Sequence, residues 1–253
     1  MTAPQHPAWH AEFSPLSVQH LGAVFIGLAV VGVWIVLARR WRGTPREPLL
    51  RGFGAGLMMM SQILMQIYWF VPRHFEPSIS LPLHVCDAAA FLAPLALLGG
   101  WRWMRVLVVF WGLGLSTQGF ITPTLEDGIG HQVYWYYWFN HLIPPAAALY
   151  EIAVRGLRPS YRDAWFAVGV SLLYVGVILV LNLATGWNYM FVGPGKPGQP
   201  TALDVLGPWP WRLLPMVLIG SGLFLAICWA IRVVAGAEET TPGPKNGARD
   251  AID

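Results

Sequence analysis

The segment SVQHLGAVFIGLAVVGVWIVLARRWR, residues 17–42, sets the class of the fold. A helix of about 20 mostly apolar residues crosses the roughly 30 Å hydrocarbon core of a membrane. This segment supplies that length and ends in an arginine cluster, as a helix that stops at a membrane surface does. The whole chain is 55% hydrophobic and 11% charged, whereas about a quarter of the residues of soluble domains are charged. The sequence therefore predicts a polytopic membrane protein.

Further apolar segments recur along the chain and predict an all-α transmembrane bundle. We expect spans at 17–38, 51–71, 81–99, 104–121, 132–153, 163–185 and 209–233. This seven-helix domain covers residues 17–234. An extracytoplasmic segment, residues 1–16, precedes it. Residues 235–253 are polar and rich in Gly and Pro, which predicts a disordered cytoplasmic tail.

The basic residues gather on one side of the predicted membrane. Thirteen of the sixteen Lys and Arg fall there: Arg39, Arg40, Arg42, Arg46, Arg51, Arg102, Arg105, Arg155, Arg158, Arg162, Arg232, Lys245 and Arg249. The other three are Arg73, Lys196 and Arg212. Cytoplasmic loops carry the excess of positive charge, so we expect the N-terminus outside and the C-terminus inside a cell membrane. A net charge of +3 is explained by this orientation, and we expect no nucleic-acid partner.

Polar residues that enter the spans do so mainly in the predicted outer half. LPLHVCD, residues 81–87, places His84, Cys86 and Asp87 at the start of the third span. Pro82 suits the first turn of a helix, so Cys86 should lie near the positive end of the helix dipole, which favours the thiolate. His84 and Asp87 share a face, but His84 and Cys86 point apart. The partner of Cys86 must then come from another helix.

The fifth span supplies a candidate partner in WFNHLIPP, residues 138–145. Pro144 and Pro145 remove helical hydrogen bonds to the carbonyls of Asn140 and His141, which predicts a polar cavity there. Cys86 and His141 differ in nominal depth by about 6 Å, which side-chain length and helix tilt could close. A Cys with a His from another element is the general form of an activated nucleophile. We expect no metal and no cofactor.

Four further polar residues are candidates for binding substrate or supporting the site: Gln118, Asn188, Lys196 and Asp204. They lie in the fourth span and in the long outer loop before the last span. The predicted topology places Cys86 and Cys228 at different depths in the membrane, too far apart for a disulfide bond. Both should therefore be free thiols. Each polar residue also has a structural interpretation, because a Cys in an apolar helix often only packs and a buried His often only joins helices.

LPLHVCD and WFNHLIPP, with TQGFITP (117–123), NYMF (188–191) and LDVLGPWPW (203–211), resemble segments of the YwaF-like family of integral membrane proteins. The resemblance runs over residues 70–211. A eukaryotic relative of that family is a membrane acyltransferase that acts on ether phospholipids. The resemblance implies that Cys86 and His141 are the active residues. Asn140 departs from the pattern, since many relatives are expected to carry a second His there.

The residues and the resemblance together predict a lipid-modifying acyltransferase or acyl hydrolase that acts on a membrane phospholipid or acyl chain. Cys86 would attack the acyl ester, His141 would move the proton, and Asn140 or Gln118 would stabilise the oxyanion. Two alternatives stay open. One is a small-solute transporter or channel, since proline-broken helices with midplane polar groups occur in transporters. The other is a non-catalytic membrane scaffold or sensor.

Overall fold

The computed structural model describes residues 10–194 and 201–240. The regular secondary structure within these residues is helical, apart from one isolated antiparallel bridge between Glu12 and Asp127. The α-helices are α1 (Val18–Arg40), α2 (Arg46–Phe70), α3 (Val85–Gly99), α4 (Arg102–Phe110), α5 (Gln118–Ile121), α6 (Gln132–Ala153), α7 (Tyr161–Thr185) and α8 (Leu213–Thr240). A π-helix, η1 (Trp111–Ser116), joins α4 to α5, and two 3-10 turns, η2 (Tyr189–Phe191) and η3 (Ala202–Leu206), lie before α8.

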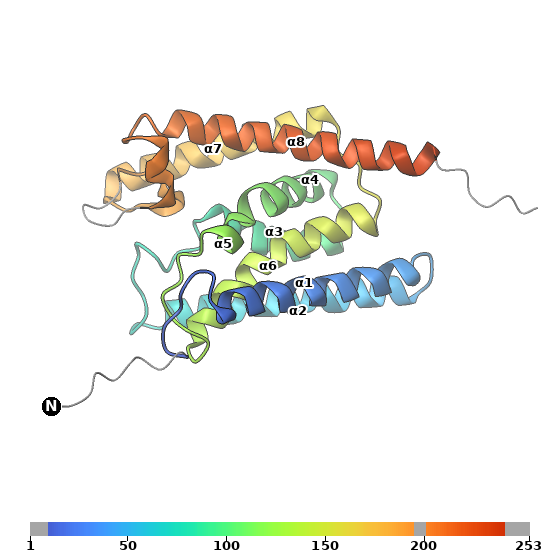
Figure 1. The fold of residues 1–253 in the computed structure, drawn as a ribbon, viewed down its shortest axis with the longest axis horizontal. Helices are drawn as coiled ribbons and strands as arrows, with labels where there is room; N and C mark the ends of the chain where they lie inside the picture. The colour runs from blue at the N-terminus through green and yellow to red at the C-terminus, as the bar shows by residue number, and fades with distance from the viewer. Residues whose placement is uncertain (1–9, 195–200, 241–253) are drawn as a thin grey trace, which may run out of the picture.

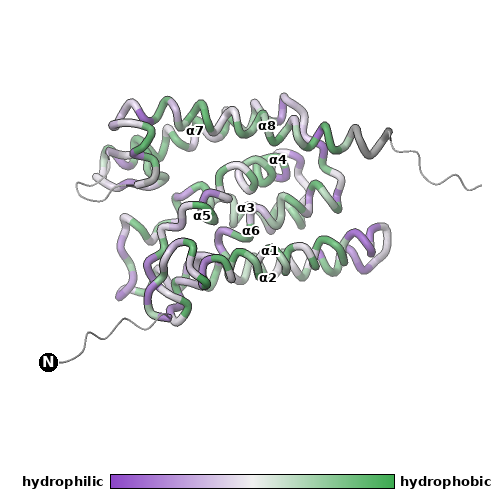
Figure 2. The backbone as a smooth tube through the Cα atoms, viewed as in Figure 1, coloured by the Kyte–Doolittle hydropathy of each residue, from purple (hydrophilic) through white to green (hydrophobic). Residues whose placement is uncertain are grey.

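The helices form three layers, with α1 and α2 on one side, α7 and α8 on the other, and α3, α4 and α6 between them (Figure 1). α3 contacts α2, α4 and α6, so it lies at the centre of the bundle. The hydrophilic segments gather in the loops at the two ends of the helices, while the helices themselves are largely hydrophobic (Figure 2). This distribution is the one that a membrane imposes on a helical bundle.

Four helices are long and apolar enough to cross a membrane: Val18–Arg40, Arg102–Ile121, Tyr161–Thr185 and Leu213–Ala235. The other three predicted spans correspond to α2, α3 and α6. α2 and α6 have the length, with 25 and 22 residues, but carry polar side chains. α3 has only 15 residues. The all-α class and several apolar transmembrane helices are therefore confirmed.

The structure shifts two of the predicted helix starts toward the C-terminus. α3 begins at Val85 and α8 at Leu213, so the expectation that Pro82 occupies the first turn of a helix was wrong. α8 extends to Thr240, into the predicted tail, whose residues 241–253 lie outside the described residues. α6 is one helix despite Pro144 and Pro145.

The loops at one end of the bundle, which we call the polar-loop end, contact one another. Residues 10–16 pair with residues 126–130, as in the hydrogen bond of 2.8 Å from Phe13 N to Glu126 O. The loop 71–84 is joined to η2, because the Tyr189 hydroxyl donates to Pro77 O at 2.7 Å and accepts from Leu81 N at 3.1 Å. The opposite end, which we call the arginine end, holds the loops 41–45, 100–101 and 154–160.

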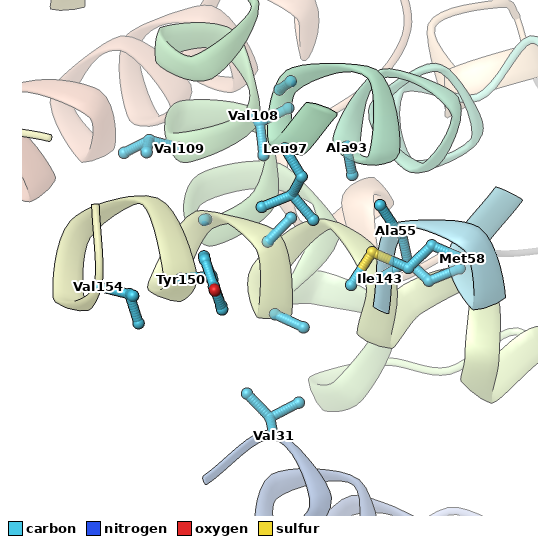
Figure 3. Packing of buried hydrophobic residues seen from close by; sticks show 14 of the residues in the cluster. Val31, Ala55, Met58, Ala93, Leu97, Val108, Val109, Ile143, Tyr150 and Val154 are labelled. Carbon is cyan, nitrogen blue, oxygen red and sulfur yellow. The ribbon is translucent and has the colours of Figure 1, made fainter. Parts of the chain in front are cut away.

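Small residues bring the central helices close together. Ala90, Ala93 and Ala96 of α3 and Ala146 and Ala147 of α6 are all buried in one core cluster. Figure 3 shows part of this cluster, with Met58 of α2 beside Ile143 of α6. Without a hydrophobic driving force between helices in lipid, small side chains favour association because they permit close backbone packing.

Buried charges join the helices at the arginine end. Glu151 of α6 is 0% exposed and pairs with Arg105 Nε at 2.5 Å and with Arg155 Nη1 at 2.6 Å. Glu47 pairs with Arg51 at 3.1 Å and accepts a hydrogen bond of 2.6 Å from the Tyr150 hydroxyl. Two carboxylates therefore pair with three of the arginines at this end.

We expect Glu151→Ala to lower the free energy of unfolding by about 3–5 kcal/mol, because it removes the buried carboxylate that pairs with Arg105 and Arg155. The matched control is Arg102→Ala. Arg102 pairs with Asp163 at 2.6 Å, but its side chain is 58% exposed, and such pairs contribute about 1 kcal/mol or less. Chemical denaturation in detergent measures both. Equal losses in the two variants would show that the Glu151 cluster does not hold the helices.

Candidate functional site

The start of α3 is built by Asp87. Its Oδ2 accepts a hydrogen bond of 3.1 Å from the backbone N–H of His84, which makes His84 the N-cap residue. A carboxylate at the third position of a helix stabilises this arrangement, since it pairs a backbone donor and faces the positive end of the dipole. The helix therefore begins at Val85, three residues after Pro82, and Cys86 and Asp87 lie in its first turn.

Asp87 also joins α3 to α6. Its Oδ1 accepts a hydrogen bond of 2.7 Å from Asn140 Nδ2, and the Cys86 Sγ lies 3.9 Å from the same oxygen. Among the described residues, no Lys or Arg forms an ion pair with Asp87. A carboxylate is thus held in the bundle by an amide, a thiol and a backbone N–H.

His141 lies one residue beyond Asn140, in a fixed orientation. Its Nδ1 is 2.8 Å from Tyr137 O, and its ring stacks on that of Tyr137 with a centroid distance of 4.2 Å. A carbonyl only accepts, so Nδ1 carries the proton and Nε2 of the neutral ring has a free lone pair. That nitrogen faces Gly119 of α5, where a Cβ atom would lie 2.6 Å from it.

The structure brings Cys86 and His141 to the same region without a direct bond. His141 lies within electrostatic range of Asp87, whose carboxylate contacts the Cys86 thiol. In the part of the chain that the structure describes, the two side chains share no hydrogen bond. Their pairing stays a prediction. Both Cys86 and Cys228 are free thiols, as predicted.

The His84 ring contacts η2. Its Nδ1 accepts a hydrogen bond of 3.3 Å from Met190 N, so the neutral ring is protonated on Nε2. Met190 and Phe191 both have left-handed backbone angles, with φ of 57° and 58°, which cost about 1–3 kcal/mol each in non-glycine residues. Burial raises the pKa of the neighbouring Tyr189. His84 therefore helps to hold a strained loop.

Gln118, Asn188 and Asp204 form no hydrogen bond with Cys86 in the described part of the chain. Gln118 is exposed in α5. Asn188 accepts a hydrogen bond of 3.0 Å from Gly193 N. Asp204 caps η3 and pairs with Arg212, a buried residue that also donates to two loop carbonyls. Lys196 lies outside the described residues. Asn188 and Asp204 thus stabilise the loop before α8.

Several buried polar residues of the helices were not predicted as site residues, among them Gln62 and Ser116. Gln62 of α2 is 0% exposed and Ser116 of η1 is 1% exposed. The Gln62 amide, the Ser116 hydroxyl and the Asn140 Oδ1 have no hydrogen-bond partner among the described residues. Unpaired buried polar groups cost about 1–3 kcal/mol each, so they mark places that bind or react. A glutamine inside MMMSQILM was the available signal.

Gln62, Asp87 and Asn140 lie toward the polar-loop end of their helices. Each of these helices contributes several residues to one core cluster, among them Met58 of α2, Ala90 of α3 and Ile143 of α6. One helical turn further toward the polar-loop end, the same helices carry Gln62, Asp87 and Asn140. We refer to Gln62, Cys86, Asp87, Asn140 and His141 as the polar site.

An apolar groove of about 570 Å³ opens beside this site between α2 and α3. It is lined by Ile63, Gln66, Ile67, Phe70, Val71, Pro72 and Phe91. Phe91 lies one turn after Asp87, and Ile63 directly follows Gln62. Ligand pockets are typically about 300–1,000 Å³. The groove therefore has the volume and the apolar lining of a ligand pocket.

The comparisons with known proteins give one family. A family model described as the TMEM164 family, a family of membrane proteins, matches residues 15–229. No curated protein and no solved structure matches the chain. The matched range contains the polar site and all the helices up to α8.

We expect Gly119→Ala to destabilise the protein by about 1–3 kcal/mol, because the new methyl group would lie 2.0 Å from His141 Cδ2. Gly169→Ala is the control, since nothing lies within 4 Å of a Cβ there. It should be neutral or stabilise α7 by about 0.5–1 kcal/mol. Thermal unfolding in detergent compares the two. If both variants unfold like the unchanged protein, α5 does not pack on His141.

Proposed function

The chain belongs to the TMEM164 family, and we propose that this member is a lipid-modifying acyltransferase or acyl hydrolase of the cell membrane. Its substrate is a membrane phospholipid or another acyl-chain lipid. The active residues are Cys86 and His141. The resemblance of LPLHVCD and WFNHLIPP to the YwaF-like family, and through it to an acyltransferase, supports the same assignment.

The observation that carries this proposal is the contact of Asp87 with both Cys86 and Asn140. It brings a thiol from α3 next to polar groups of α6, inside helices that are otherwise apolar. Polar and ionisable groups are expensive in a membrane and mark functional sites by default. A scaffold would not need a thiol, an imidazole with a free lone pair and a carboxylate in one region.

The groove between α2 and α3 favours a lipid over a small polar solute. Its lining is apolar apart from Gln66, whose amide donates to Ser80 O at 3.1 Å. An apolar lining leaves a polar solute without hydrogen-bond partners, whereas an acyl chain needs none. The groove lies at the membrane-facing side of α2, so a lipid can enter it without passing through water.

The chemistry starts when the Cys86 sulfur attacks the acyl carbonyl carbon and a C–S bond forms. His141 Nε2 takes the thiol proton and passes it to the leaving alcohol as the C–O bond breaks. A hydroxyl group of a second lipid, or water, then attacks the thioester while His141 Nε2 takes its proton. The C–S bond breaks, and His141 passes that proton to the departing Cys86 sulfur. Asn140 and Gln118 are proposed donors to the oxyanion. Cys86 and His141 must come within about 3 Å of each other for this transfer.

We further propose that the chain crosses the membrane seven times with the polar-loop end outside. α1, α2, α3, the α4–η1–α5 segment, α6, α7 and α8 would be the crossings. The gathering of the arginine-bearing loops at one end supports this orientation. α3 is short, but its ends are satisfied by protein groups.

We expect Cys86→Ala and His141→Ala to lower acyl transfer by on the order of 10³-fold or more, since each removes a member of one reacting unit. The measurement uses purified protein in phospholipid vesicles with an isotopically labelled acyl chain, followed by mass spectrometry of the lipids. Cys228→Ala is the control, because that thiol is buried among apolar residues and donates to Pro159 O at 3.5 Å.

Activity that survives in Cys86→Ala, or that Cys228→Ala removes equally, would refute the assigned nucleophile. No exchange by the unchanged, folded protein with any phospholipid class would leave the transporter or scaffold interpretation.

The orientation predicts that a reporter active only in the cytoplasm works when fused after Asp253. The same reporter inserted into the loop 122–131 should be silent, with both fusions inserted in the membrane. The reverse pattern would contradict the orientation, and activity at both positions would contradict the number of crossings.

A further inference from the structure

His20 of α1 is a buried titratable residue that the proposed chemistry does not use. It is 3% exposed and lies 100 residues before the segment that it contacts. Its Nδ1 accepts a hydrogen bond of 2.9 Å from Leu16 N, and its Nε2 lies 2.9 Å from Phe120 O in α5. Its ring stacks on Trp138 of α6 at 5.4 Å.

These contacts fix the protonation of the ring. Nδ1 receives a proton from Leu16 N–H, so it carries none of its own, and the carbonyl of Phe120 can only accept. The neutral ring is therefore protonated on Nε2 and donates to α5. This is the opposite tautomer from that of His141, which is protonated on Nδ1.

The α5 turn lies between His20 and His141. The Phe120 carbonyl accepts from His20, while the carbonyl of the preceding Gly119 accepts a hydrogen bond of 3.0 Å from the Tyr137 hydroxyl. Gly119 packs so closely on the His141 ring that a Cβ atom would lie 2.0 Å from its Cδ2. α5 has only four residues. A turn this short depends on outside contacts, because it is below the length at which helices are stable alone.

We propose that His20 is a positioning residue for His141. By donating to Phe120 O, it holds α5 against the imidazole, and α5 in turn keeps the ring stacked on Tyr137 with Nε2 shielded. The role of His141 as a general base rests on the proposed function. The mechanical link from α1 through α5 to His141 rests only on the contacts above.

A competing role for His20 is to hold the start of α1. Its Nδ1 bonds Leu16, whose φ of 62° is left-handed and unfavourable for a non-glycine residue. The two roles use different ring nitrogens. Substitutions that keep only one of these hydrogen bonds can therefore separate them.

His20→Gln and His20→Asn form the matched pair. A glutamine amide can place its N–H₂ group near the position of Nε2, so it keeps the donor to Phe120 O. An asparagine amide can place its oxygen near the position of Nδ1, so it keeps the acceptor for Leu16 N. Both lose the stacking on Trp138, which makes each the control for the other.

The readout is the rate at which diethyl pyrocarbonate modifies His141, measured for each histidine by peptide mass spectrometry in the folded protein. His74 is the internal reference, because its Nδ1 lies 3.1 Å from Tyr68 O and its ring stacks on Tyr68 at 4.1 Å, away from α5. We expect His20→Asn to raise the rate at His141 by about fivefold, the effect of one lost hydrogen bond on local opening. His20→Gln should stay close to the unchanged protein, and His74 should not change.

A faster rate in His20→Gln with a normal rate in His20→Asn would overturn the proposal, because His20 would then act through Leu16. Equal rates at His141 in all three proteins would overturn it as well. Thermal unfolding confirms that each variant is folded, and Gly119→Ala provides an independent disturbance of α5. If His20→Asn alone exposes His141 while no protein shows acyl transfer, the positioning role stands and the proposed function fails.

Discussion

The short length of α3 is the constraint on which the rest of the structure depends. Fifteen residues span only about 22 Å at the α-helical rise, less than the roughly 30 Å of the hydrocarbon core. In the seven-span topology proposed above, α3 would leave backbone groups of its ends at membrane depth, where unpaired groups are costly. Asp87 satisfies the first end, and Arg51 and Arg155 donate to the carbonyls of the last turn at 2.6 and 3.0 Å.

This constraint places polar groups at both ends of one central helix. At the arginine end, the charges are matched by Glu47 and Glu151, so that end is closed and serves stability. At the polar-loop end, Asp87 has no cationic partner in the described structure, and Gln62 and Asn140 keep unpaired atoms nearby. Under the proposed function, the lipid substrate would bind at this incompletely satisfied end, with its acyl chain in the groove that Phe91 helps to line.

The apolar segments of the sequence predicted where the helices lie, because insertion of a helix into lipid depends mainly on its composition and length. They could not predict that α3 begins at Val85, since that start is decided by one side-chain bond from Asp87 to His84. Cys86, Asp87, Asn140 and His141 were recognised as polar residues in apolar runs. Their connection through Asp87 was not, because contacts between helices depend on rotation and tilt. Glu151 and Gln62 were missed for the same reason.

The central claim is that Cys86 carries an acyl group during the reaction. The most direct measurement is mass spectrometry of the protein itself, after brief incubation with phospholipid vesicles and acid quenching. The account predicts an acyl thioester on the peptide that contains Cys86, sensitive to hydroxylamine and absent from the peptide that contains Cys228. A chain that exchanges lipid acyl groups with no adduct on Cys86, or with equal adducts on both cysteines, would contradict it.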